Sequence, residues 1–367
     1  MQSNDILFQP IKIGDIALPN RIVMASMSRA RTENPGNIPV ALQAEYYRQR
    51  SSAGLILSEG TWPSEEAIGA VHVPGLFTDR QAEGWKRVTE AVHAAGGRIF
   101  AQLGHCGAAS HPDLHDGRLP LAPSAVSLEQ PVFTPDGFKT SPVPQAMTLS
   151  DIERTIGDYA RATRLARQAG FDGVELHGIV GYLIPEFLND AFNLRHDRYG
   201  GSIENRARFP LEVLEAMIGE WAPGRVGLKL SPGVGLGKLQ PTAPTLPTYA
   251  YLVAHVSRLK IAYLQLYHPA VDLTGTPVEA LAGGTAAYFR QFYDGVIMAN
   301  GGLTQASARA MIESGDADLV SFGAPDIANP DLVERFKRGL PLAAADVETY
   351  YQGGERGYTD YPRLVIE

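Results

Sequence analysis

Residues 84–103 read GWKRVTEAVHAAGGRIFAQL, and this stretch decides how the rest of the chain is interpreted. Its first half repeats apolar residues at intervals of three and four, from Trp85 through Val88 to Val92, which is typical of one face of an amphipathic helix. Gly96 and Gly97 interrupt that pattern, and the apolar run after them is typical of a short buried strand. We therefore interpret the stretch as a helix, a glycine turn and a strand.

The same order of helix, glycine-containing turn and apolar strand recurs along the whole chain. Strands that are buried on both faces read as continuous apolar runs, and eight of them alternating with helices close naturally into a barrel. No Gly/Ser-rich or Pro-rich linker separates the repeats. We therefore predict an α/β protein, a (β/α)8 TIM barrel that forms a single domain over residues 1–367. The candidate strands are Arg21–Ala25, Leu55–Ser58, Arg98–Gln102, Gly173–Leu176, Val226–Leu230, Ala262–Leu266, Val296–Ala299 and Leu319–Phe322.

The composition is that of a soluble globular enzyme or binding protein. Of the 367 residues, 44% are hydrophobic and 20% are charged, and the formal net charge of −8 disfavours a nucleic-acid surface, which needs clustered Lys and Arg. Cys106 is the only cysteine, so we expect no disulfide and no Cys-based zinc site. The start lacks a signal-peptide pattern, and no apolar run approaches the roughly 20 residues of a membrane span. We expect a cytoplasmic monomer or homo-oligomer that binds a small-molecule substrate, without a nucleic-acid or membrane partner.

Polar residues gather directly after the predicted strands, at the barrel end where active sites of this fold lie. Two connections, Leu103 to Thr148 and Ser231 to Pro247, are too long to be simple turns. Long βα loops are commonly lids or pocket walls, so we predict that residues 103–148 form a capping loop, the alternative being a mobile surface insertion. The polar groups after the first four strands are Ser26–Arg29, Glu59–Gly60, Gln102–His105 and His177–Tyr182.

Several longer motifs occur in an order that resembles the Old Yellow Enzyme family. Besides residues 84–103, they read LFQPIKIGDIALPNRIVMA, YYRQRSSAGLILSEGT, AGFDGVELHG, NLRHDRYGGSIENRARFPLEV, DLVSFG, IANPDL and GYTDYP, and they extend from Leu7 to Pro362. The resemblance implies a barrel that binds FMN, takes a hydride from NAD(P)H and passes it to an activated C=C bond. FAD is disfavoured because the chain has no G-x-G-x-x-G fingerprint with a second nucleotide domain.

The resemblance assigns the contacts of the flavin ring to residues that follow four of the strands. Ser26 and Ser28 follow the first strand, and Ser28 stands where the family usually has a Thr whose hydroxyl reaches the flavin O4. Gly60 brings backbone groups to the ring edge, and Gln102 matches a Gln that binds the pyrimidine end. Lys229 occupies the family's Arg position near N1 and O2, where a positive charge stabilises the anionic reduced ring but Lys lacks the planar fork of Arg.

The resemblance places the flavin phosphate at the loops after the seventh and eighth strands. There, backbone N–H groups and a helix start hold phosphate in barrels of this kind. The residues concerned are Gly301, Gly302, Gly323 and Ala324, and the family has an Arg at position 324. We therefore expect FMN to bind without one charge-assisted contact, which is worth on the order of 1.5–3 kcal/mol.

The reacting end is expected in the segment from His177 to Tyr182. In the family, a His and a His or Asn three residues later polarise the substrate carbonyl, and a Tyr two residues further on gives a proton to the α-carbon. His177 and Tyr182 keep two of these positions and are the predicted catalytic residues, whereas Val180 replaces the second donor. Tyr267 and Tyr351 are further candidates for the substrate pocket.

Three functions remain open on these observations. The first is an FMN- and NAD(P)H-dependent ene-reductase, with a larger and less polar pocket because Gly104, Ala70 and Ala108 replace bigger family side chains. The second is a flavin-dependent isomerase, desaturase or other specialised biosynthetic enzyme. The third is a barrel that has lost FMN and acts as a binding protein or cofactor-free catalyst. No metal site is expected, because His105, His111 and His115 of the long third loop lack a confirming helix and the carboxylates that would support metal ligands.

Overall fold

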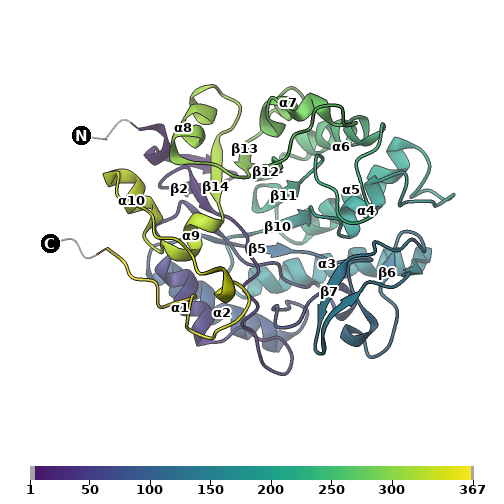
Figure 1. The fold of residues 1–367 in the computed structure, drawn as a ribbon, viewed down its shortest axis with the longest axis horizontal. Helices are drawn as coiled ribbons and strands as arrows, with labels where there is room; N and C mark the ends of the chain where they lie inside the picture. Colours follow the sequence, from purple (N-terminus) through teal and green to yellow (C-terminus); the bar gives the residue numbers. More distant parts are fainter. Residues whose placement is uncertain (1–4, 365–367) are drawn as a thin grey trace.

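The computed structural model describes residues 5–364 and places eight parallel strands in a closed barrel, which confirms the predicted fold. The order around the barrel is β10-β11-β12-β13-β14-β3-β4-β5, so barrel strands that are consecutive in sequence are neighbours in space. Figure 1 shows them at the centre of the molecule. The predicted domain's ends, residues 1–4 and 365–367, lie outside the described residues. The barrel strands are β3 (Ile22–Met24), β4 (Leu55–Leu57), β5 (Ile99–Leu103), β10 (Gly173–Gly178), β11 (Val226–Leu230), β12 (Tyr263–Tyr267), β13 (Ile297–Asn300) and β14 (Leu319–Phe322).

The ends of several strands differ from the prediction by one or two residues, although all eight strands are present. The run Gly173–Leu176 continues to Gly178 in β10, and the run Arg98–Gln102 moves to Ile99–Leu103 in β5. Ladder hydrogen bonds decide where a strand ends, and the apolar pattern alone does not report them. The longer β10 matters for function because His177 becomes part of the strand and pairs with Lys229 of β11.

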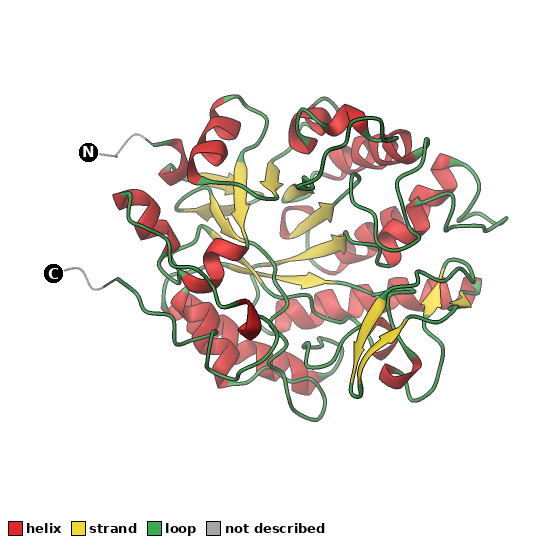
Figure 2. Ribbon diagram, viewed as in Figure 1, coloured by secondary structure: helices red, strands yellow, loops and turns green. Residues whose placement is uncertain are grey.

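Helices surround the barrel and cover the outer faces of its strands (Figure 2). Thr78 and Thr148 begin the two long helices α2 and α3, because their hydroxyl groups accept the N–H groups of Gln81 and Asp151. The connection predicted for Ser231–Pro247 is shorter in the structure, because α6 already begins at Thr245. The helices are α1 (Ala41–Gln49), α2 (Asp79–Ala94), α3 (Leu149–Gln168), α4 (Leu183–Leu188), α5 (Ile203–Glu220), α6 (Thr245–Leu259), α7 (Thr285–Arg290), α8 (Gln305–Glu313), α9 (Ala324–Ala328) and α10 (Leu332–Arg338).

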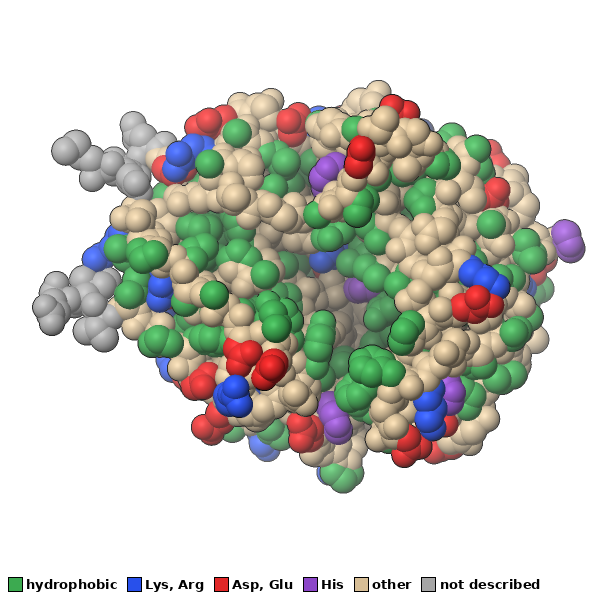
Figure 3. Space-filling view, viewed as in Figure 1, with side chains coloured by type: hydrophobic (Ala, Val, Ile, Leu, Met, Phe, Trp, Pro, Cys, Tyr) green, Lys and Arg blue, Asp and Glu red, His purple; other side chains and the backbone are tan. Residues whose placement is uncertain are grey.

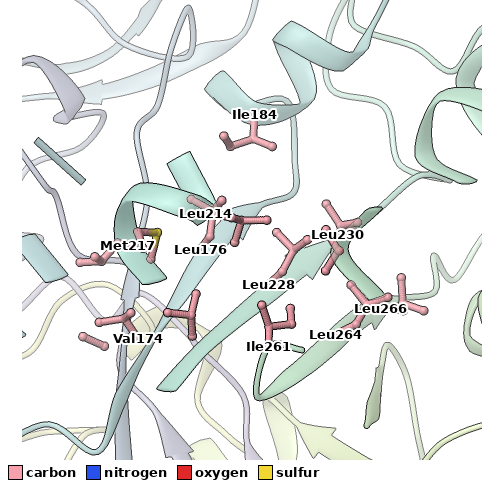
Figure 4. Packing of buried hydrophobic residues seen from close by; sticks show 14 of the residues in the cluster. Val174, Leu176, Ile184, Leu214, Met217, Leu228, Leu230, Ile261, Leu264 and Leu266 are labelled. Carbon is pink, nitrogen blue, oxygen red and sulfur yellow. The ribbon is translucent and has the colours of Figure 1, made fainter. Parts of the chain in front are cut away.

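The alternation of side chains along the strands separates the outer core from the barrel interior. On β10, Val174 and Leu176 belong to the large hydrophobic cluster that includes Leu214 of α5 (Figure 4). Because successive side chains of a strand point to opposite faces, Glu175 and His177 point into the barrel. The same alternation applies to β11 and β12, so the apolar residues of these strands anchor the helices while their polar residues reach the interior.

An N-terminal hairpin closes the opposite end of the barrel. Its strands β1 (Ile11–Ile13) and β2 (Ile16–Leu18) pair antiparallel, and they pack with Phe100 and Tyr263 in a second hydrophobic cluster. Gly14, at the hairpin turn, lies so close to Gly224 that an added Cβ would be 2.4 Å from the Gly224 carbonyl oxygen. Gly224 precedes β11, so the hairpin covers the N-terminal ends of the strands. The C-terminal ends are left for the functional site.

The segment predicted as a capping loop, residues 103–148, forms two small sheets rather than an irregular loop. The strand β6 (Leu121–Ala122) pairs with β9 (Gln145–Ala146), and β7 (Pro131–Thr134) pairs with β8 (Gly137–Thr140) as a hairpin. Leu128 accepts a backbone hydrogen bond from Lys238, so the segment contacts the loop after β11. Its action as a cap stays a prediction.

None of the described helices has both the length and the apolar character needed to cross a membrane.

Candidate functional site

A chain of hydrogen bonds crosses the barrel interior near the C-terminal ends of the strands. The Ser26 hydroxyl donates to Oε1 of Gln102 at 2.7 Å, and Nε2 of Gln102 donates to Oε1 of Glu175 at 2.7 Å. Because a carboxylate only accepts, Glu175 dictates which end of the Gln102 amide faces it. Figure 3 shows a hollow at the centre of this face, with a basic and a histidine side chain at its bottom.

Lys229 lies beside this chain, with 3% of its surface exposed, and pairs in register with His177 of β10. Burial lowers the pKa of Lys229, and the negative charge of Glu175 raises it. Conversely, burial raises the pKa of Glu175, whereas Lys229 lowers it. The hydroxyl group of Tyr263 adjoins the Glu175 carboxyl and also lowers the pKa of that carboxyl. Burial thus opposes the charge of each group, and each group favours the charged form of the other.

Small residues leave room next to these polar groups. A Cβ added to Gly60 would lie 3.7 Å from Oγ of Ser28 and 3.8 Å from Oε1 of Gln102, so the three residues border one space. A Cβ added to Gly323 would lie 3.5 Å from the sulfur of Met27, which is the neighbour of Ser28 in sequence. The structure thus brings together the ring-binding residues predicted from β3, β4 and β5. Their donors and acceptors fit the pyrimidine end of a flavin.

The residues predicted for the phosphate also meet at the C-terminal ends of β13 and β14. Gly301 has a φ of +116°, and an added Cβ would lie 2.1 Å from the carbonyl oxygen of His268, so only glycine fits there. The backbone N–H groups of Gly302 and Ala324 donate to no acceptor within residues 5–364. Ala324 is exposed at the start of α9. Free amides at two adjacent strand ends fit a phosphate group.

The predicted catalytic residues lie against each other. The rings of His177 and Tyr182 stack with their centroids 4.8 Å apart and 28° between their planes. Burial and the charge of Lys229 lower the pKa of His177 to about 3, so its imidazole is neutral at physiological pH, and its Nδ1 has no partner in the described chain. Cys106 and burial raise the pKa of Tyr182 well above its usual value, so the phenol keeps its proton. The pair therefore presents a neutral nitrogen and a protonated hydroxyl.

Val180 lies between these residues in a backbone conformation that β-branched side chains rarely adopt. Its φ is +60°, in the left-handed region that favours Gly and Asn. Its N–H group donates to Oγ of Ser231 at 3.3 Å, which ties the loop after β10 to the loop after β11. The sequence did not point to Ser231, because the contact joins residues 51 positions apart. The position thus keeps a backbone suited to a polar side chain but carries an apolar one.

The two remaining candidates for the substrate pocket come from the end of β12 and from the C-terminal segment. Tyr267 ends β12 and lines a cavity of about 650 Å³ between the loops at residues 233–241 and 267–278. Tyr351, which is 60% exposed, lies in the C-terminal segment, near enough to Tyr182 to help raise the pKa of that phenol. Within residues 5–364, no group of three or more His, Cys, Asp and Glu side chains is arranged to hold a metal ion.

Two buried arginines hold the C-terminal segment against the site, a contact that the sequence did not reveal. Arg31 donates to the carbonyl groups of Thr349 and Tyr350, and Arg29 donates to the carbonyl of Tyr350. Both arginines lie just after Ser28, so the segment carrying Tyr351 is fastened to the same loop that borders the predicted flavin site. The sequence signal available was only a pair of charged residues directly after a strand.

Comparison with known proteins identifies the relatives of this chain. The model of the NADH:flavin oxidoreductase / NADH oxidase family matches residues 6–343. A probable flavin mononucleotide-dependent alkene reductase from Leishmania infantum is 38% identical over 368 residues, which cover 98% of each chain. The match includes all eight barrel strands and the segment at residues 103–148.

Solved structures show the same arrangement of the backbone. The old yellow enzyme homologue from Zymomonas mobilis superposes with a TM-score of 0.92 at 40% identity, covering 98% of this chain and 99% of that protein. Morphinone reductase in complex with tetrahydroNAD has a TM-score of 0.91 at 43% identity, with 98% of each chain covered.

Proposed function

Because the chain belongs to the NADH:flavin oxidoreductase / NADH oxidase family, we propose that it reduces an activated C=C bond, such as that of an enone, with hydride from NAD(P)H. It is a flavin-dependent oxidoreductase of the Old Yellow Enzyme type with FMN as its cofactor, which confirms the resemblance seen in the sequence. The stacked pair of His177 and Tyr182 beside the buried cation Lys229 is the observation that carries the proposal.

When bound, FMN would supply the hydride-transfer chemistry that links NAD(P)H to the β-carbon of the alkene. Ser28, Gly60 and Gln102 would hold its pyrimidine end. Lys229 would supply a positive charge that favours the anionic reduced form. Gly302 and Ala324 would donate their free amides to the phosphate.

His177 would bind the carbonyl oxygen of the substrate. Its pKa of about 3 keeps it neutral, so it donates a hydrogen bond and does not transfer its proton. Negative charge grows on this oxygen as the β-carbon accepts hydride, and the nearby charge of Lys229 favours that growth.

Tyr182 would give its hydroxyl proton to the α-carbon. The raised pKa of its phenol keeps the proton in place until carbanion character develops there. The segment that carries Tyr351, fastened by Arg29 and Arg31, would then limit the shape of substrates that reach this hydroxyl.

The proposal is tested by separating the two half-reactions under anaerobic conditions. Tyr182→Phe should leave reduction of the flavin by NAD(P)H unchanged and slow its reoxidation by an enone by about 10²-fold or more, because only the second step needs the proton. Tyr288→Phe, which changes a half-buried tyrosine on the outer helix α7, is the matched control and should leave both steps unchanged. Equal reoxidation rates in Tyr182→Phe and the native protein would contradict the assignment.

A second function, a flavin-dependent isomerisation or desaturation, is favoured by one observation. Val180 supplies no second donor to a carbonyl oxygen, although the backbone there suits Asn. If NAD(P)H reduces the flavin but no conjugated carbonyl compound reoxidises it, the specialised reaction is the better assignment.

A further inference from the structure

Glu175 is a fully buried carboxyl group that the proposed mechanism does not use. It lies on β10, where it pairs in register with Gln102 of β5 on one side and with Gly227 of β11 on the other. Isolated buried carboxylates are costly, so a charged residue in the middle of an apolar strand calls for a physical reason. Two of its neighbours, Gln102 and Lys229, are the residues assigned to the pyrimidine end of FMN.

On the β5 side, Glu175 fixes the Gln102 amide. Nε2 of Gln102 is held by Glu175 and Oε1 by the Ser26 hydroxyl, each at 2.7 Å. The amide therefore has one defined orientation before any ligand arrives. The second proton of Nε2 and the second lone pair of Oε1 are left for a ring that carries both an N–H group and a carbonyl.

On the β11 side, Glu175 opposes the desolvation of Lys229. An arginine would stay charged however deeply it is buried, but an amine releases its proton when burial becomes costly. Lys229 pairs in register with His177, two residues after Glu175, so the side chains of Glu175 and Lys229 enter the barrel interior from neighbouring strands. The charge of Glu175 accordingly raises the pKa of Lys229. The replacement of the family's Arg by Lys therefore makes a counter-ion necessary at this position.

We propose that Glu175 is a positioning residue that orients the Gln102 amide and acts as the counter-ion that keeps Lys229 charged toward the reduced flavin. The inference rests on the proposed function only for the place of FMN in the barrel. It does not depend on which alkene, if any, is reduced.

The groups that face this carboxyl from the surrounding strands are few. Lys229 faces it from β11, the Tyr263 hydroxyl from β12 and Gln102 from β5, while His177 follows it on β10. Burial and Glu175 raise the pKa of Tyr263, and His177 is neutral above a pH of about 3. Lys229 is thus the basic group of this set whose pKa burial lowers from its ordinary value while Glu175 raises it.

The test measures binding of oxidised and of reduced FMN to the apoprotein between pH 6 and pH 10. Glu175→Gln keeps an acceptor for Gln102 but removes the charge. In this variant we expect the preference for reduced over oxidised FMN to fall about tenfold as the pH rises and Lys229 loses its proton, since one pKa unit corresponds to a factor of ten. The fall should begin at a lower pH than in the native protein. In Glu175→Gln/Lys229→Arg, the guanidinium stays charged and the preference should not fall. Titration of the flavin itself is common to all variants and cancels in the comparison.

Two further variants make the outcome decisive. Glu175→Asp withdraws the carboxylate by one methylene group and should lose the preference at an intermediate pH, so the test stands even if Glu175→Gln folds poorly. Glu186→Gln changes a fully buried carboxyl on α4 that binds the N–H group of Ala108, and it should behave as the native protein does. A pH profile of Glu175→Gln equal to the native one, or a fall that persists with Arg at position 229, would overturn the proposal.

Discussion

Replacing Val180 by Asn is expected to stabilise the fold and to restore a substrate contact in a single step. The φ of Val180 is +60°, and a non-glycine residue held in this region costs about 1–3 kcal/mol, more for a β-branched residue than for Asn. For a chain of 367 residues, the entropy of unfolding converts each kcal/mol into about 1–2 °C of melting temperature. Val180→Asn should therefore raise the melting temperature by a few degrees at most.

The same substitution adds a donor beside His177. Removing one preorganised donor from an oxyanion site costs about 10²–10³ in rate, so adding one is worth up to that factor if the amide reaches the substrate oxygen. The assay is stopped-flow reoxidation of the reduced enzyme by a simple cyclic enone. Thermal unfolding of the same samples reports the change in stability.

Val180→Gly is the control that separates the two effects. Glycine adopts a positive φ without strain but supplies no donor, although it gives back part of the gain through the larger entropy of its unfolded chain. Faster reoxidation is thus expected only with Asn at position 180, whereas a relief of strain is expected in both variants. Equal reoxidation rates with Asn and Gly would refute the view that a donor is missing there.

Three further substitutions test other parts of the site. Ala324→Arg should tighten FMN by about ten- to a hundredfold in an equilibrium titration, because the side chain at this exposed helix start has room to reach the phosphate; an unchanged dissociation constant would place the phosphate elsewhere. Lys229→Met should lower the flavin midpoint potential and slow reduction by NAD(P)H, and a native potential would remove Lys229 from the site. Burial raises the pKa of Glu59 from 4.5 to about 7, so its contribution to stability is full below pH 4.5 and is lost as the pH rises toward 7. Glu59→Gln should therefore remove this pH dependence of the free energy of unfolding, which amounts to about 1.4 kcal/mol for each unit by which the pKa is raised. An unchanged pH dependence in thermal melts would contradict the assignment.

The barrel was predictable because its strands carry continuous apolar runs that alternate with helices. The polar groups inside the barrel were harder to predict, because Glu175 and Lys229 lie within sequence runs that are otherwise apolar. A charged residue within a strand that must be buried on both faces is a signal of an interior polar site, and Glu175 carries that signal. The strand ends were less predictable, because they depend on ladder hydrogen bonds with neighbours.

Contacts between distant segments lay beyond the reach of the sequence. Arg31 donates to the carbonyl of Thr349 across 318 positions, and no local pattern encodes that pairing. The left-handed backbone at Val180 was hidden for a different reason, because Val is a poor indicator of it and the following Gly181 also has a positive φ. At such positions tertiary contacts override the local preference of the residue, so the sequence alone does not reveal the backbone conformation.

The departures from the family pattern act on separate steps because of where the barrel places them. Val180 follows β10 and Ala324 follows β14, and four steps along the strand order separate these strands in a closed ring of eight, so the residues lie on opposite sides of the barrel. Changes at sites that share no partner add in free energy. Lys229, by contrast, lies beside both Glu175 and His177, so its charge acts on the cofactor and on the substrate oxygen together. A change at Lys229 is therefore expected to couple with changes at those two residues, whereas Ala324 should affect how tightly FMN is held without altering how the carbonyl is polarised.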